Sequence, residues 1–157
     1  MFFVHLHQVK QLNVKSMDKI TKENFNYDSV VALINKVGDS EIVKREQNGY
    51  VIIETKSVKP FQELFVYSKD NARWCFCHKM KNCKSAAEYY YDYVTLHNGK
   101  QFILFDFSKE YPNPKSVIAF TTWGDKISNA FTLDNCSCDR NFYGVSFDEF
   151  TDLLLNK

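Results

Sequence analysis

Three consecutive strand-like segments between residues 101 and 133 constrain the fold more than any other feature of the sequence. Gln101 to Phe107, Ser116 to Trp123 and Lys126 to Leu133 are rich in β-branched and aromatic residues, which is the composition typical of strands. Gly124-Asp125 separates the last two segments and is a tight-turn signal. The stretch therefore predicts an antiparallel meander.

Helical and extended patterns alternate before the meander. Residues 26–37 carry apolar side chains at helical spacing, and Gly38 follows as a stop signal. Tyr50 to Thr55 has the composition and length of a strand. Pro60 suits the first turn of a short helix covering residues 61–65. Residues 1–20 alternate loosely, which is compatible with a first strand.

Two capping boxes predict further helices. Ser85 and Glu88 open a segment that should remain helical until Asn98-Gly99, and Ser146 and Glu149 open a closing helix. We find no linker, internal repeat or low-complexity segment. The sequence thus predicts an α+β fold, with residues 1–157 as a single domain and helices packed on one face of an antiparallel sheet.

Composition and charge narrow the functional classes. The chain is 45% hydrophobic and 25% charged, as in ordinary globular proteins, and its formal net charge is +1. That charge does not favour nucleic acid or an acidic membrane as a partner. No apolar run approaches the roughly 18 to 20 residues of a membrane span. The lack of a secretion signal and the odd number of cysteines, five, indicate the cytoplasm.

The five cysteines fall into two clusters, which raises the question of a metal site. Alternate residues of an extended segment point to the same side, so each cluster could aim two sulfurs at one zinc ion. The candidate zinc ligands are Cys75, Cys77, Cys136 and Cys138. His78 and Cys83 are alternative ligands. Neither cluster has the two-residue spacing of zinc knuckles, which favours the alternative that the cysteines act as small hydrophobes in or beside strands.

A cysteine nucleophile is the second chemical hypothesis. Cys75 follows Arg73 closely, and a neighbouring cation favours the reactive thiolate. His78 or His97 would serve as base, with Asp106 orienting the imidazole. The structural alternative is that these side chains are packed or solvated. The sequence lacks a Gly-rich phosphate loop, a His-Glu-x-x-His motif and a Gly-x-Ser-x-Gly motif. Enzymatic activity is therefore left undecided.

Aromatic residues suggest a binding surface. Consecutive residues on a helix point about 100° apart, so the tyrosines of the helix predicted to begin at Ser85 cannot all be buried on one face. Exposed rigid aromatic side chains serve as anchors in protein interfaces. The candidate binding residues are Arg73, Trp74, Tyr90, Tyr91 and Tyr93.

Around Ala72-Arg73-Trp74-Cys75 the sequence resembles a loose group of uncharacterised small proteins from tailed bacteriophages. These have a Trp-Cys pair after a short helix, then an aromatic-rich helix, a glycine and an aromatic strand. The matching pieces are residues 61–65, Trp74-Cys75, Tyr90, Tyr93, Gly99, Phe102-Ile103 and Asp134-Asn135. The match spans residues 57–135, and Arg73 and Phe76 replace the small residue and threonine that usually flank the pair. The resemblance implies a phage origin and transfers no activity.

Together these observations favour a small phage-type protein that binds a host or phage protein, in a host-takeover or counter-defence role. A near-zero net charge and surplus aromatic residues suit protein contacts better than contacts with nucleic acid. The alternatives are a cysteine-dependent hydrolase or transferase using Cys75 and a zinc-stabilised binding module. No other cofactor is expected.

Overall fold

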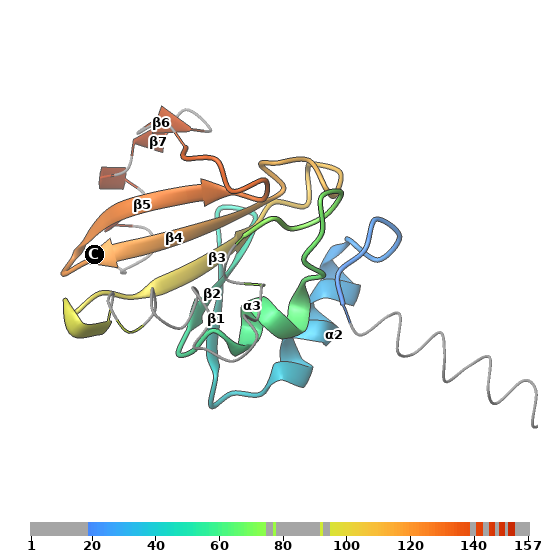
Figure 1. The fold of residues 1–157 in the computed structure, drawn as a ribbon, viewed down its shortest axis with the longest axis horizontal. Coiled ribbons are helices and arrows are strands. Elements are labelled where there is room, and N and C mark those ends of the chain that lie inside the picture. Colours follow the sequence, from blue (N-terminus) through green and yellow to red (C-terminus); the bar gives the residue numbers. More distant parts are fainter. Residues whose placement is uncertain are drawn as a thin grey trace, which may run out of the picture.

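The structure of the chain, a computed structural model, describes residues 19–74, 77, 92, 95–138, 141–142, 145–146, 148–149 and 151–152. Its largest element is a five-stranded sheet whose strands follow chain order, each antiparallel to its neighbours (Figure 1). These strands are β1 (Ile42–Gln47), β2 (Tyr50–Thr55), β3 (Gln101–Phe105), β4 (Val117–Trp123) and β5 (Lys126–Thr132). The helices described over their full length are α2 (Tyr27–Val37) and α3 (Lys59–Leu64), and a separate strand pair comprises β6 (Asn141–Phe142) and β7 (Val145–Ser146). The chain has the predicted α+β fold.

The predicted meander is formed by β3, β4 and β5. Ile103 at the middle of β3 pairs with Ala119 of β4, and the pairing continues into β5. β3 ends at Phe105, two residues earlier than the sequence predicts. The chain turns there because the Asp106 carboxylate accepts a hydrogen bond from the Ser108 backbone N–H at 3.0 Å, as in the turns that Asp favours.

β3 is the central strand of the sheet, and all five of its side chains are buried. Successive side chains of a strand point to opposite faces, so β3 contributes to two apolar clusters. On one face Ile103 and Phe105 join a large cluster with α2 and α3. On the other face Phe102 and Leu104 pack with apolar residues of β2, β4 and β5. Burial on both faces explains why residues 102–105 read as a continuous apolar run.

Both described helices lie on the same face of the sheet (Figure 1). α2 matches the predicted helix. The Asn26 side chain caps it by accepting from the Ser29 N–H at 3.0 Å, and Val30 and Ile34 are buried against the sheet. It ends at Gly38, whose φ of +102° favours glycine. Within the described segments, no helix combines the length and apolar character needed to cross a membrane.

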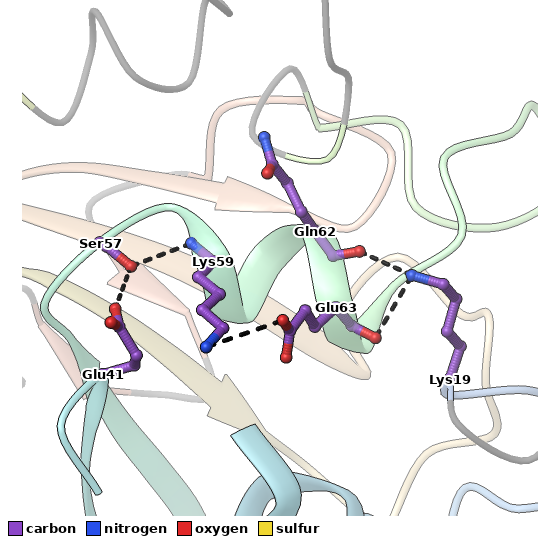
Figure 2. A network of polar contacts seen from close by, with 6 residues as sticks. All are labelled: Lys19, Glu41, Ser57, Lys59, Gln62 and Glu63. Carbon is purple, nitrogen blue, oxygen red and sulfur yellow. Dashed lines mark hydrogen bonds and ion pairs between the residues drawn. The ribbon is translucent and has the colours of Figure 1, made fainter. Parts of the chain in front are cut away.

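α3 is the predicted short helix and begins two residues earlier than expected. Polar side chains tie both of its ends to the rest of the domain (Figure 2). At its start, the Ser57 hydroxyl accepts from the Lys59 N–H at 3.1 Å and donates to the Glu41 carboxylate. At its end, Lys19 Nζ donates to the Gln62 carbonyl oxygen at 2.6 Å and to the next carbonyl at 3.3 Å. The lysine thus satisfies carbonyls that a helix C-terminus leaves without partners.

β1 is an element that the sequence reading missed. It is an outer strand with several exposed polar side chains, so its sequence lacks the apolar run by which β2 is recognised. Its pairing with β2 is nevertheless signalled by Asn48-Gly49, whose φ angles are +52° and +82°. A two-residue turn with both φ angles positive is the geometry for which Asn-Gly is preferred in β-hairpins.

Several predicted elements lie partly or wholly outside the described residues. These are most of the strand expected within residues 1–20 and most of the helix opened by Ser85. The second capping box is confirmed: the Ser146 N–H donates to the Glu149 carboxylate at 2.9 Å, and the Glu149 N–H donates to the Ser146 hydroxyl at 3.3 Å.

Candidate functional site

Trp74, a candidate binding residue, lies in the core. Its side chain is fully buried, and its ring packs edge-on against Phe61 at 5.7 Å and Phe65 at 5.1 Å between centroids. The indole N–H donates to the Thr132 carbonyl oxygen at the end of β5. This placement favours a structural role, in which the indole joins α3 to the sheet, over that of a surface anchor.

The chain segments that carry the two cysteine clusters meet at the end of β5. On one side, the Arg73 N–H donates to the Leu133 carbonyl oxygen at 3.0 Å. On the other side, the Thr132 N–H donates to the Cys136 carbonyl oxygen at 2.9 Å. The Thr132 hydroxyl also donates to the Asp134 carboxylate, and this bond holds the pKa of that carboxyl below its usual value. The sequence could not indicate this proximity.

The described cysteine side chains do not converge. Cys77 belongs to the cluster on the helix-bearing face of the sheet, whereas Cys138 packs against the cluster on the other face. Cys136 is exposed, and Cys75 lies outside the described residues. Within the part of the chain that the structure describes, no group of three or more His, Cys, Asp or Glu side chains is arranged to hold a metal ion. The four-cysteine zinc site stays a prediction.

The two described members of the candidate catalytic set lie apart. His97 precedes β3 and Asp106 follows it, and a five-residue strand at about 3.3 Å per residue separates them by roughly 15 Å or more. Asp106 is buried and accepts hydrogen bonds from the Ser108 N–H and hydroxyl, so its carboxylate organises its own loop. Asp106 is therefore not placed to orient the His97 imidazole. The remaining candidates for catalysis and binding, Cys75, His78, Tyr90, Tyr91 and Tyr93, lie outside the described residues.

A different group of side chains stands out on the surface. Leu96, His97 and Trp123, which we call the Trp123 surface, lie where β3 begins and β4 ends. The imidazole of His97 stacks on the indole of Trp123, with centroids 4.3 Å apart and planes 27° apart. Trp123 is 52% exposed and Leu96 is 82% exposed. Leu96 is linked to this stack through its chain neighbour His97, and large apolar side chains exposed in one region are typical of recognition surfaces.

The backbone around the Trp123 surface is fixed by hydrogen bonds. The Lys100 N–H donates to the Thr122 hydroxyl at 2.7 Å, and the Thr122 N–H donates to the Lys100 carbonyl oxygen at 2.9 Å. These bonds hold the segment that carries His97 against the end of β4. The register between β4 and β5 shifts just before Trp123, and such irregularities commonly redirect a neighbouring side chain. The indole is therefore presented from ordered backbone.

Polar groups border the Trp123 surface. Lys100 Nζ lies 3.1 Å from a carboxylate oxygen of Glu54, and Asp125 and Lys126 at the following turn are exposed. An apolar centre with a mixed-charge border has the composition of a protein interface, in which the border remains hydrated. It offers a partner one large aromatic anchor, and because about half of the Trp123 side chain is exposed, a contact can bury roughly 100 Å² of it.

Sequence reasoning missed Trp123 and Leu96 as functional residues. A usable signal was present, because a tryptophan directly before a Gly-Asp turn sits at the tip of a hairpin, where burial by neighbouring strands is incomplete. The predicted helix end at Asn98-Gly99 similarly places Leu96 in a last turn. The two features become one surface only through the pairing of β3 with β4, which brings Gln101 opposite Thr121.

Comparison with known proteins gives no relationship on which to build. No protein-family model matches the chain, and neither the curated proteins nor the solved structures contain a significant match. The phage resemblance therefore stays a prediction, and the function has to be argued from the surface itself.

Proposed function

We propose that this protein acts by binding another protein, with the Trp123 surface as the anchor of the contact. The observation that carries the proposal is the half-exposed indole of Trp123 stacked on His97, whose chain neighbour Leu96 is exposed. Tryptophan is the residue type most enriched among side chains that dominate binding energies. The exposed part of the ring remains in contact with water, and a partner that covers it gains the free energy of burying that apolar surface.

The charge distribution supports a protein over a nucleic acid as the partner. A single-stranded nucleic acid would stack a base on Trp123, but affinity would also require a basic track for the phosphates. Here Lys100 is paired with the Glu54 carboxylate, and Lys126 follows the acidic Asp125. The formal net charge of the whole chain is only +1. That the partner is a host or phage protein follows from the sequence resemblance alone.

The test uses the full chain as bait in a bacterial lysate at physiological salt. We expect a partner to be retained by the wild type and by Val43→Ala, which shortens an exposed apolar residue on the outer strand β1. We expect Trp123→Ala to lose most of that partner, with a melting temperature close to the wild-type value. Equal recovery with Trp123→Ala, or no recovery above background with the wild type, would count against the proposal.

A further inference from the structure

A hollow of about 330 Å³ lies at the opposite end of the sheet from the Trp123 surface. It is lined by residues of the β1–β2 turn and the start of α2: Tyr27, Glu46, Gln47, Asn48, Gly49, Tyr50 and Val51. Val51 pairs with Phe105 at the far end of β3, whereas the Trp123 surface lies beyond Gln101 at its start. The volume falls at the lower end of the range of small-ligand sites.

Two aromatic rings and a carboxylate form the walls of this hollow. The Tyr27 hydroxyl donates a hydrogen bond to Glu46 Oε1, which links the first turn of α2 to β1. The ring of Tyr27 is held edge-on against Phe107, with centroids 6.2 Å apart, and is 46% exposed. Tyr50 lines the hollow from the first position of β2. A carboxylate has about four acceptor positions, so Glu46 keeps accepting capacity beyond its bond with Tyr27.

The charge around the hollow is negative. None of its seven lining residues is a lysine or arginine, and Glu46 is the charged one. The pKa of Tyr27 is raised by the hydrogen bond to Glu46, by slight burial and by the charges of Glu46 and Asp28. The pKa of Tyr50 is raised by burial and by the charge of Asp106. Three carboxylates thus act on the two phenol groups, and a cation would be attracted to the same place.

We propose that this hollow binds an organic cation, an alkylammonium or guanidinium group, against the faces of Tyr27 and Tyr50 with Glu46 as its counter-charge. Aromatic faces attract such cations electrostatically, and tyrosine side chains are common walls of ammonium sites. The adjacent carboxylate adds a charge-assisted hydrogen bond where the cation carries N–H groups. The chemistry is shared by free amines and by lysine or arginine side chains of another protein.

The test is a titration of the full chain followed by NMR at constant ionic strength. The probes are tetramethylammonium, butylammonium and methylguanidinium chlorides, with neopentyl alcohol as an uncharged control that is one oxygen atom larger than tetramethylammonium. We expect saturable shifts centred on the amides of Tyr27, Asn48 and Gly49 with the cations. The alcohol should leave these signals unchanged or bind at least about tenfold more weakly. Equal shifts with the alcohol, or shifts that do not saturate, would overturn the proposal.

Variants identify the groups responsible. Glu46→Gln keeps the shape of the side chain and should weaken cation binding at least about threefold. Tyr27→Leu should weaken it further because it removes a ring. Glu63→Gln removes an exposed carboxylate on α3 and should bind like the wild type. Binding unchanged by Glu46→Gln and by Tyr27→Leu would place the cation elsewhere and contradict the assignment.

Capped amino acids distinguish the two sources of the cation. If N-acetyl-arginine or N-acetyl-lysine methylamide binds as tightly as the free cations, the hollow accepts a side chain of a partner protein. If the capped residues bind at least about tenfold more weakly, the ligand is a free amine or guanidine. Both results are consistent with the proposed cation site and differ only in the source of the cation. The titration does not depend on the proposed function, because Trp123→Ala should leave every cation shift in place.

Discussion

Tyr111 shows how burial shapes the properties of one residue in this domain. Its ring is buried beside Phe25, 5.4 Å away between centroids, and its hydroxyl has no hydrogen-bond partner among the described residues. A buried polar group without a partner costs about 1 to 3 kcal/mol. Tyr111→Phe should therefore raise the free energy of unfolding by about 1 kcal/mol, measured by urea denaturation.

The matched control is Tyr27→Phe, which removes a hydroxyl that does have a partner, Glu46. Its free energy of unfolding should fall slightly or stay unchanged, since the bond lies at an exposed site. A loss of stability in Tyr111→Phe as large as a broken buried hydrogen bond would mean that the Tyr111 hydroxyl is satisfied after all.

The burial of Tyr111 also predicts how the stability of the protein changes at alkaline pH. Burial, and secondarily the neighbouring Cys77, raise the pKa of Tyr111 above that of an unfolded tyrosine, which is about 10. As pH rises, the phenol of Tyr111 loses its proton in the unfolded chain before it does so in the folded protein. The free energy of unfolding is therefore unaffected by this group below pH 10 and falls as pH rises beyond 10. Tyr111→Phe should flatten the fall in stability above pH 10. A parallel fall in wild type and variant would contradict this assignment.

Trp74 contributes to stability rather than to a surface. Trp74→Phe removes the indole N–H that bonds to the Thr132 carbonyl and leaves a small cavity against Phe61 and Phe65. We expect the free energy of unfolding to fall by about 2 kcal/mol. Trp123→Phe is the matched control and should change stability by less than about 0.5 kcal/mol, because its side chain is half exposed. Similar losses in the two variants would refute the structural role.

At the scale of elements, the β1–β2 turn depends on backbone conformation rather than on packing. Gly49 has φ of +82°, and among the described residues, apart from its two chain neighbours, no atom lies within 4 Å of where a Cβ would stand. Gly49→Ala should therefore cost about 1 kcal/mol through backbone strain alone, measured by thermal or urea unfolding. Asn48→Gly, one residue earlier, should stay within a few tenths of a kcal/mol of the wild type. A neutral Gly49→Ala would show that the turn differs from the one described.

The elements differ in how far the sequence could specify them. α2 and the β3–β5 meander were predictable because caps, apolar spacing and the Gly124-Asp125 turn all point to the same structure. β1 was not predicted because an outer strand needs few apolar residues, although Asn48-Gly49 marks its hairpin.

The candidate site was harder to predict from the sequence than these elements. Which aromatic residue stays exposed depends on tertiary packing: Trp74 packs against Phe61 of α3, whereas Trp123 lies beyond the end of the pairing between β3 and β4.

At the scale of the whole molecule, the sheet separates two regions with different chemistry. The end where β3 begins carries the Trp123 surface, and the end where β3 stops carries the hollow lined by Tyr27 and Glu46. The five residues of β3 lie between these two ends, and the two sites have no residue in common. Substitutions at one end should therefore leave binding at the other unchanged, as expected for sites that share no contact.

The central claim is that Trp123 itself contacts a protein partner, and site-specific photo-crosslinking tests it most directly. A photoreactive phenylalanine analogue replaces the exposed Asp125, two residues from the intact Trp123, or, as a control, the exposed Val43 of β1 in the full chain. We expect irradiation in bacterial lysate to give one dominant protein adduct from position 125 and none of it from position 43. Excess unlabelled wild-type protein should suppress that adduct, whereas excess Trp123→Ala should not. Equal suppression by the two competitors, or the same adduct from both positions, would contradict the account.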